Sequence, residues 1–414
     1  MCNSSKGWEQ DRSAAACCMS RRSLFYIAYD RYPAPKGAAT HISAFVSALR
    51  HQFDELDLVT VAAAPTTHSM SVAQSPPSGN LNFRHTELPA VGPSMIERVL
   101  HFRTQLRGWW SKRKPDVAHV RSIFEGYPIA RRKSDWCKKL VFEVNGLPSI
   151  ELKYHYPKVA DDRELMAKLL TQENACLEAA DLIITVSDVN AAYLKQRGAD
   201  PDRICVIPNG VDLNLFTYRS PQPVGIRPLS LLYSGTLTSW QGVNTAIEAL
   251  ALVRREMPAK LRIIGSGRPA QIRTLNELAS RLGVADHVKI CDGTSQMELA
   301  RAHHEADVIL IPLLPNDRNL LQGCCPLKVL EAMASGTPLI ASDMPVVSCL
   351  VRNGIDGQLV RPGSAKSIKD GLLRFRDDPH FAQACSENAR TRIENEFTWD
   401  RAGEKLRTAY QTYL

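Results

Sequence analysis

A chain of 414 residues, 44% hydrophobic and 23% charged, is long enough for two domains and has the composition of a globular protein. No apolar run approaches the ~18 residues that a membrane-spanning helix needs, which argues against an integral membrane protein. Eleven cysteines without a CxxC pair favour reduced thiols in a cytoplasmic protein over a disulfide framework or a zinc site.

The first half of the chain alternates apolar runs with helical patterns, after a flexible tail that we expect over residues 1–22. Six runs predict strands: LFYIAY, LDLVTV, DVAHV, KLVFEV, LIITV and RICVI. Continuous apolar strands separated by helices indicate a parallel sheet covered on both faces. We therefore expect a first α/β domain over residues 23–208.

A second set of strands follows a segment rich in Pro, Gly and Asn, which predicts an interdomain linker at residues 209–224. The second set is LSLLYSG, LRIIGSG, HVKIC, DVILIP and PLIAS. These runs predict a second domain over residues 225–395, and a last helix at 396–414 is expected to return to the first domain. The fold prediction is two doubly wound Rossmann-like domains facing across a cleft, with ligands beyond the carboxyl ends of the strands.

Two glycine-rich turns have more than one interpretation. Gly265 and Gly267 end a strand in LRIIGSG, where they either let a ligand approach the backbone or form an ordinary turn. Gly37 opens the helix after the first strand, where a phosphate could bind, although no complete nucleotide fingerprint is present. His41 on that helix is expected to be a packed or capping histidine.

The stretch PLKVLEAMASG predicts a short helix that begins near Pro326 and ends at Gly336, with Lys328 and Glu331 on one face. A surface ion pair between them would contribute only ~0.2–0.5 kcal/mol. A cation near a helix N-terminus also opposes the macrodipole, unless an anion sits between it and the free N–H groups. We therefore favour a ligand with a phosphate at Lys328 and sugar hydroxyls at Glu331.

The segment from Arg98 to Lys139 is basic, with twelve Lys or Arg against three Asp or Glu. Its first part is either an amphipathic helix at an anionic membrane surface or a helix packed on the first sheet. The membrane interpretation relies on Arg103, Arg107, Trp109, Trp110, Lys112, Arg113 and Lys114. No nucleic-acid-binding module accompanies these charges, so we expect no nucleic-acid partner.

Four stretches together resemble the retaining GT-B glycosyltransferases of family 4 (glycosyl transferases group 1). They are PLKVLEAMASGTPLIASDMPVVSCLVRNGIDGQLVRPGS, VIPNGVDLNLF, LRIIGSG and FTWDRAGEKLRTAYQTYL. The resemblance implies a nucleotide-diphosphate sugar, UDP- or GDP-linked, on the second domain and a saccharide or lipid-linked acceptor on the first. It also implies no cofactor, no catalytic metal, and work in the cytoplasm, at the inner face of the plasma membrane for a lipid-linked acceptor.

The resemblance also suggests donor-binding residues. The family's Glu-x7-Glu motif places its second Glu on the ribose and its first on the sugar; Glu331 matches the second, whereas Gly323 occupies the first position. Thr236 and Gln241 stand where the family has an Arg and a Lys for the diphosphate, and Lys328, or more weakly Arg318, is the expected replacement. The full expected donor set is Gly37, Gly235, Thr236, Gln241, Gly265, Gly267, Arg318, Gly323, Cys325, Pro326, Leu327, Lys328 and Glu331.

On the acceptor side, Asn145 stands where the family often has a histidine, and it joins Glu143, Lys328 and Glu331 as a catalytic candidate. His119, Arg121 and Glu151 are further acceptor-side candidates, with a structural hydrogen bond as the alternative for each. Two other functions stay open at this point. They are a catalytically silent nucleotide-sugar-binding subunit, motivated by Gly323, Thr236 and Gln241, and a nucleotide-sugar epimerase on the same fold.

Overall fold

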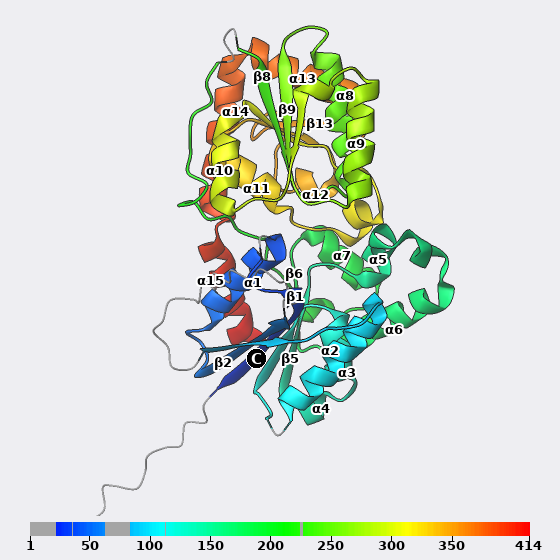
Figure 1. Ribbon diagram of the computed structural model, residues 1–414. Helices are drawn as coiled ribbons and strands as arrows, with labels where there is room; N and C mark the ends of the chain where they lie inside the picture. Colours follow the sequence, from blue (N-terminus) through cyan, green and yellow to red (C-terminus); the bar gives the residue numbers. More distant parts are fainter. Residues whose placement is uncertain (1–21, 35, 63–82, 112, 224–226) are drawn as a thin grey trace, which may run out of the picture.

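The computed structural model describes residues 22–34, 36–62, 83–111, 113–223 and 227–414. Within these ranges the chain forms two parallel sheets, each flanked by helices, in two domains stacked one above the other (Figure 1). The prediction of two doubly wound α/β domains is confirmed. The expected N-terminal tail lies almost wholly outside the described residues.

The first sheet has the strand order β3-β2-β1-β4-β5-β6-β7, with every neighbouring pair parallel. Its strands are β1 (Ser23–Arg31), β2 (Glu55–Val61), β3 (Phe83–Leu88), β4 (Val117–Val120), β5 (Lys139–Val144), β6 (Leu182–Thr185) and β7 (Ile204–Val206). The helices are α1 (Gly37–Leu49), α2 (Met95–Trp110), α3 (Ile123–Arg131), α4 (Lys133–Trp136), α5 (Pro148–His155), α6 (Arg163–Ala179) and α7 (Asp188–Gln196), with short 3-10 turns η1 (Pro157–Asp161) and η2 (Pro201–Arg203). The six predicted strands are present; β3, an edge strand with polar residues on both faces, was missed.

The second sheet has the order β10-β9-β8-β11-β12-β13, again entirely parallel. Its strands are β8 (Leu229–Ser234), β9 (Ala259–Ile264), β10 (Val288–Cys291), β11 (Val308–Ile311), β12 (Leu339–Ser342) and β13 (Gln358–Val360). The helices are α8 (Val243–Val253), α9 (Pro269–Arg281), α10 (Gln296–Glu305), α11 (Leu327–Ser335), α12 (Pro345–Ser348), α13 (Ala365–Asp377), α14 (Pro379–Glu396) and α15 (Trp399–Tyr413). Shorter turns are the 3-10 segments η3 (Ser239–Gln241) and η4 (Ala285–His287) and the π-helical η5 (Arg318–Gln322). The five predicted strands are present, and only the three-residue edge strand β13 was missed.

The chain passes between the domains twice, and the two passages touch. Val211 pairs with Thr398 in an isolated parallel bridge, and a side chain at Gly210 would overlap the Thr398 backbone. Beyond this crossing, α15 leaves the second domain and packs along α1 of the first (Figure 1). Its Tyr410 is buried in the core of the first domain with Leu24 and Phe53, so the last helix ties the domains together.

Strands at the centre of both sheets are buried from end to end, as a parallel sheet covered on both faces requires. The cysteines of the described ranges all carry free thiols. Among the same residues, no helix has the length and apolarity to cross a membrane.

Candidate active site between the two domains

Helix α11 carries Lys328 and Glu331 in its first turns, directly after Pro326, which is the N-cap residue instead of the first helical residue. The helix ends at Gly336, whose φ of +81° suits a glycine C-cap. Lys328 Nζ donates to Gln241 Oε1 at 2.6 Å and to the Tyr233 hydroxyl at 3.3 Å. Lys328 and Gln241, both predicted on the donor side, therefore contact each other directly. The sequence did not indicate that Tyr233 also contacts Lys328.

Glu331 is 8% exposed, and no group among the described residues donates a hydrogen bond to its carboxylate or pairs with it. Burial raises the pKa of Glu331 to about 7, and nearby Lys328 opposes this rise. Burial, together with the positive charge of Arg318, lowers the pKa of Lys328 to about 7, although the charge of Glu331 acts to raise it. Buried polar groups in proteins are normally satisfied, so this carboxylate is suited to accept hydrogen bonds from a ligand.

Gly323 stands where a carboxylate would be expected, and its backbone explains why none is there. Its φ is +79°, and a Cβ on it would lie 2.7 Å from the Asn190 amide nitrogen and 2.8 Å from Ser187 Oγ. Ser187 is the N-cap of α7 in the first domain. The position is thus closed by the facing domain, and any larger residue there would push the domains apart.

The other glycines of the predicted donor set serve packing. A Cβ on Gly235, whose φ is +137°, would lie 2.7 Å from Lys328 Nζ, so this glycine makes room for the lysine. A Cβ on Gly265 would overlap the Gly235 carbonyl, and one on Gly267 would lie 2.8 Å from the Leu237 side chain. The space beside Gly265 and Gly267 is therefore filled by the loop after β8, which favours the turn interpretation over a ligand contact.

Thr236 stands at a position where the family has a cation for the diphosphate, and it supplies no charge there. Its carbonyl accepts a hydrogen bond from the Tyr233 hydroxyl at 2.6 Å, and its side chain lies 3.3 Å from Thr238 Oγ1 at the surface. Gly37 opens α1 directly against α11, since a Cβ on it would lie 2.9 Å from Leu327 Cδ1. The predicted phosphate position at the start of α1 therefore lies close to the start of α11.

Arg318 and Glu151 were predicted for opposite rims, and the structure brings them together. Arg318 Nε donates to Glu151 Oε1 at 2.9 Å, and Gln322 Nε2 donates to the same oxygen at 2.8 Å. Gln322 also accepts from the Leu147 N–H at 2.9 Å, and its carbonyl accepts from Asn190 Nδ2 at 2.6 Å. Segment 318–323 is thus docked on the first domain through polar contacts.

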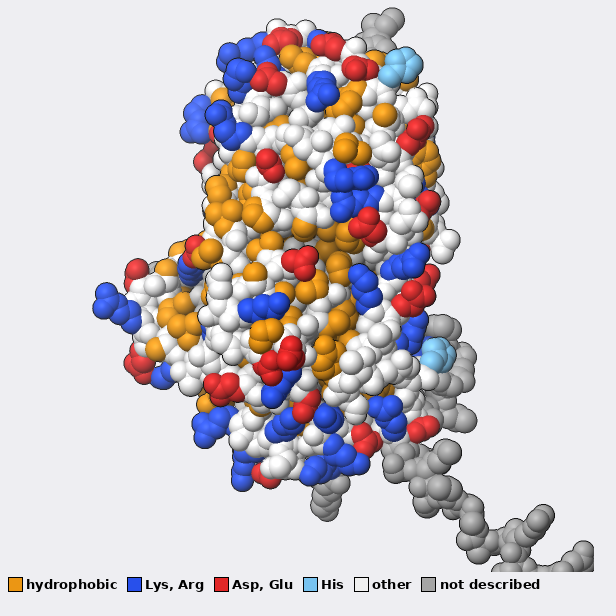
Figure 2. All heavy atoms as spheres, turned by 180° about the vertical axis from the view of Figure 1, so that it is seen from behind, with side chains coloured by type: hydrophobic (Ala, Val, Ile, Leu, Met, Phe, Trp, Pro, Cys, Tyr) orange, Lys and Arg blue, Asp and Glu red, His pale blue; other side chains and the backbone are white. Residues whose placement is uncertain are grey.

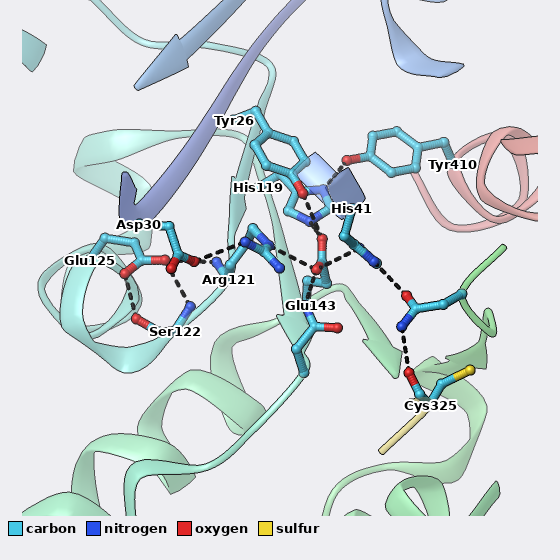
Figure 3. A network of polar contacts seen from close by, with 12 residues as sticks. Tyr26, Asp30, His41, His119, Arg121, Ser122, Glu125, Glu143, Cys325 and Tyr410 are labelled. Carbon is cyan, nitrogen blue, oxygen red and sulfur yellow. Dashed lines mark hydrogen bonds and ion pairs between the residues drawn. The ribbon is translucent and has the colours of Figure 1, made fainter. Parts of the chain in front are cut away.

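The remaining acceptor-side candidates form a buried network around Glu143, which Figure 3 shows in close-up. Glu143 is fully buried and is contacted by Tyr26, His41, His119, Arg121 and Asn145. Although burial alone would raise it, His41, Arg121 and His119 hold the pKa of Glu143 well below its usual range. Because no surface of Glu143 is exposed, this carboxylate acts on its neighbours and not directly on a substrate.

His119 and Arg121 were expected on the rim of the cleft, and the structure places them beneath it, at 0% and 7% exposure. His119 Nδ1 lies 2.5 Å from the Tyr410 hydroxyl, and Arg121 Nη1 donates to Asp30 Oδ2 at 3.0 Å. Burial lowers the pKa of His119. Both side chains satisfy internal partners, which favours the structural hydrogen bond over a direct acceptor contact for these two residues. Asn145 is the half-buried member of the network.

His41 is packed, as expected, with its ring 4.0 Å from the Phe45 ring. Its second role was not indicated by the sequence: Nε2 lies 2.9 Å from Glu143 Oε1, and Nδ1 lies 2.7 Å from Asn209 Oδ1. Asn209 in turn donates to the Cys325 carbonyl at 2.7 Å, just before α11 begins. The NG pair of VIPNGVDLNLF was the only available signal for this link.

Most of the proposed membrane patch is structural. Trp110 is 3% exposed and donates to the Trp136 carbonyl, while Trp109 packs 4.9 Å from the Phe25 ring. Arg103 donates to the carbonyls of Phe124 and Ile123 and to Gln172, and Arg113 donates to buried Asp57. Trp110 is therefore unavailable at headgroup depth and Trp109 is half-buried, which favours the alternative of a helix packed on the first sheet. Arg107 and Lys114 are exposed, and Lys112 lies outside the described residues.

The side chains on the back of the molecule mix both signs of charge (Figure 2). No group of three or more His, Cys, Asp or Glu side chains arranged to hold a metal ion occurs in the described part of the chain. Asp162 and Asp378, each the second acid of an Asp-Asp pair in the sequence, are the N-caps of α6 and α14.

Two family models match this chain in sequence. Residues 35–215 match Glycosyltransferase Family 4, and residues 219–392 match Glycosyl transferases group 1. The two matches fall on the two domains and together span most of the chain. The protein therefore belongs to the glycosyltransferases of this group, with the GT-B fold.

Individual relatives agree with this placement. WcaL of Salmonella typhimurium, whose name assigns it to colanic acid biosynthesis, is 28% identical over 252 residues, which are 60% of this chain and 61% of WcaL. The chain thus matches about three fifths of that relative's length. A D-inositol 3-phosphate glycosyltransferase of Corynebacterium glutamicum is 25% identical over 403 residues, covering 90% of this chain and 91% of that enzyme.

Solved structures show the same fold. A sucrose-phosphate synthase from Thermosynechococcus elongatus superposes with a TM-score of 0.78 at 22% identity, over 95% of this chain and 99% of that one. The Anabaena protein HepE in complex with UDP-glucose superposes with a TM-score of 0.70 at 15% identity, over 94% and 99% of the two chains.

Proposed function

We propose that this glycosyltransferase moves a hexose from a nucleotide-diphosphate sugar, UDP- or GDP-linked, to an acceptor with retention of anomeric configuration. The observation that carries the proposal is the buried Glu331 carboxylate, which has no hydrogen-bond partner among the described residues and follows Lys328 by one helical turn. A nucleotide sugar offers both groups what they lack. Its ribose hydroxyls can donate to Glu331, and its diphosphate can neutralise Lys328.

Departure of the nucleoside diphosphate requires that its growing negative charge be stabilised. Lys328 and the free N–H groups at the start of α11 supply that stabilisation in our proposal, because helix N-termini favour anions. Arg318 contributes less, since Glu151 already holds its guanidinium at 2.9 Å. Glu143 is too deeply buried to attack the sugar. We therefore assign proton removal from the acceptor to the leaving phosphate itself, on the front face of the sugar, without a cofactor.

Names of related proteins support the donor and acceptor classes. HepE has been solved with UDP and with UDP-glucose, and WcaL is named for colanic acid biosynthesis. We propose a saccharide or lipid-linked acceptor on the first domain, used at the cytoplasmic side of the membrane. Exposed Ile96 and Leu100 on α2, with Arg107 and Lys114, are the groups left to meet an anionic membrane surface.

A donor screen tests the proposal. The purified protein is incubated with UDP-, GDP- and ADP-sugars, with and without a membrane extract, and released nucleoside diphosphate is followed together with the anomeric configuration of the product. We expect release from one donor, with loss in Glu331→Gln and Lys328→Ala. Tight nucleotide binding without release under any acceptor condition would contradict catalysis and favour the silent binding subunit, whose motivation is the absent cationic pair at Thr236 and Gln241.

A further inference from the structure

A single chain of polar contacts connects the buried centre of the first domain to the donor helix of the second (Figure 3). It runs from Glu143 through His41 and Asn209 to the Cys325 carbonyl, with steps of 2.9, 2.7 and 2.7 Å. Each residue comes from a different part of the fold: β5, α1, the interdomain linker and the residue two before α11.

The hydrogen-bond roles along this chain can be assigned from its ends. The Cys325 carbonyl can only accept, so Asn209 presents its Nδ2 to Cys325 and its Oδ1 to His41. His41 Nδ1 must therefore carry a proton. Its Nε2 faces the Glu143 carboxylate, which is ionised because its pKa is held low. Both ring nitrogens thus face acceptors: Nδ1 is hydrogen-bonded to Asn209, and Nε2 makes a 2.9 Å contact with Glu143 that lacks the geometry of a hydrogen bond.

Other groups around Glu143 balance its charge and fill its remaining contacts. Arg121 pairs with Glu143 on one side and with Asp30, which is 38% exposed, on the other, so Arg121 is the buried cation that balances Glu143. His119 can remain neutral, with Nε2–H donating to Glu143 and the Tyr410 hydroxyl donating to Nδ1.

Helix α1 presents this link on the face that meets the second domain. Gly37, Thr40 and His41 share one side of the helix, because residues three and four apart lie together. Gly37 lies against Leu327, and Thr40 Oγ1 accepts from Gln296 Nε2 at 2.8 Å. Asn209 is adjacent to Gly210, where the two interdomain passages touch. The link therefore sits at the point about which the domains would move.

We infer that His41 and Asn209 are positioning residues for sugar transfer: they form a latch that holds the start of α11, with Lys328 and Glu331, at a fixed place relative to the acceptor domain. The inference rests on the proposed function only in assigning the donor to α11. Domain closure positions the reacting groups, so loosening the latch should slow sugar transfer. The affinity for a ligand that only the second domain binds should stay the same.

Asn209→Asp is the sharpest test, because the shape is kept and His41 still finds an acceptor, while a carboxylate oxygen now faces the Cys325 carbonyl. We expect kcat, expressed per nucleotide-binding site, to fall at least tenfold, and the Kd for the free nucleoside diphosphate to stay within twofold. His41→Gln should behave alike, since glutamine has one nitrogen where histidine places two on opposite sides of its ring, and Glu143 keeps four other contacts.

Thr40→Val is the matched control, because it removes an interdomain hydrogen bond from the same helix face outside the latch; its turnover should stay within twofold. Equal losses in Thr40→Val and Asn209→Asp, or wild-type kcat per site in both latch variants, would overturn the inference. A parallel loss of nucleotide affinity would also overturn it, because the donor rim itself would then be distorted.

Small-angle X-ray scattering of the nucleotide-free protein provides a readout that needs no turnover. We expect Asn209→Asp to have a larger radius of gyration than wild type and Thr40→Val, with an unchanged melting temperature. Were the wild-type protein to release no nucleotide from any donor, the proposed function would fail, and the scattering would still decide the latch. An unchanged radius of gyration in both latch variants would overturn it.

Discussion

Lys328 Nζ lies 2.6 Å from Gln241 Oε1, so the ammonium in the first turn of α11 is bound by a neutral amide. A neutral amide orients the ammonium without cancelling its charge, whereas a carboxylate there would compete with a phosphate. Lys328 Nζ also lies over the Tyr233 ring, 4.5 Å from its centroid, and this cation–π contact holds the ammonium in the same position. In the proposed function, one lysine held in this way serves the diphosphate in place of the Arg and Lys that the resemblance leads us to expect.

Replacing Lys328 by alanine should therefore remove most of the stabilisation of the leaving group. We expect a loss of about 2–4 kcal/mol of transition-state stabilisation, a fall of roughly 30- to 800-fold in kcat/KM. The measurement is nucleoside diphosphate release at several donor concentrations. Lys366→Ala, at an exposed lysine on α13, is the control, and turnover by Lys328→Ala close to that of wild type would contradict the assigned role.

The pH dependence of kcat/KM follows from the same pair. Glu331 has a pKa of about 7, so below this pH its carboxylate is protonated and loses affinity for donating hydroxyls. Lys328 also has a pKa of about 7, so above this pH it is neutral and loses its attraction for the diphosphate. Because activity needs the charged form of each, we expect a narrow bell centred near pH 7 for the free enzyme.

Lys328→Arg separates the two limbs of this profile. Arginine stays protonated at all working pH values, so the alkaline limb should disappear while the acidic limb remains. Glu331→Gln should conversely flatten the acidic limb. A profile whose alkaline limb is unchanged in Lys328→Arg would show that another group titrates there.

Helix α11 could be predicted from the sequence because its signals are local. A proline, a lysine, a glutamate and a closing glycine within eleven residues mark a short helix. Unbroken apolar runs mark the central strands. Strands β3 and β13 were missed because edge strands lack that apolar continuity. Beyond the NG pair at Asn209, the sequence carries no signal for the latch, since His41 and Asn209 are 168 positions apart and meet only when the linker crosses α15.

The sequence also did not reveal how deeply a residue at the end of a strand is buried. His119, Arg121 and Glu143 do stand at strand ends, as predicted, but Tyr410 from α15 covers His119 from 291 positions away. The tryptophans of α2 were ambiguous for a different reason. A helix that buries one face against a sheet and a helix that buries one face in a membrane have the same periodicity, and only the contacts with Phe25 and Trp136 decide.

The exposed cations of the predicted membrane patch can be tested for membrane binding without disturbing the fold. Arg107 and Lys114 are exposed, so Arg107→Ala with Lys114→Ala should weaken binding to vesicles containing anionic lipid and leave the melting temperature unchanged. Sedimentation with phosphatidylserine vesicles measures the first effect. Arg281→Ala with Lys289→Ala removes two exposed cations of the second domain as a control; unchanged vesicle binding in the α2 variant would end the membrane proposal.

Arg113→Ala should behave differently, although it belongs to the same stretch of sequence. Its guanidinium donates to Asp57, which is 1% exposed, and stacks 4.4 Å from the Trp109 ring. Removing it leaves the buried Asp57 carboxylate with Arg84 as its remaining cationic partner among the described residues, so we expect the free energy of unfolding to fall by roughly 1–3 kcal/mol and the melting temperature to fall with it. Thermal unfolding of the two variants side by side distinguishes surface charge from structural charge.

Gly323 allows a prediction about the missing carboxylate itself. Gly323→Glu restores the family motif in sequence, yet its Cβ would lie 2.7 Å from the Asn190 amide nitrogen, and its φ of +79° is unfavourable for any L side chain. We expect this variant to lose transfer activity, because the facing domain must retreat from α11. Gly283→Ala is the matched control for backbone strain, since Gly283 has a φ of +69° and nothing within 4 Å of the added carbon. It should lower stability by about 1 kcal/mol and leave kcat unchanged. A Gly323→Glu enzyme more active than wild type would mean that this position meets the sugar directly and that α7 yields to it.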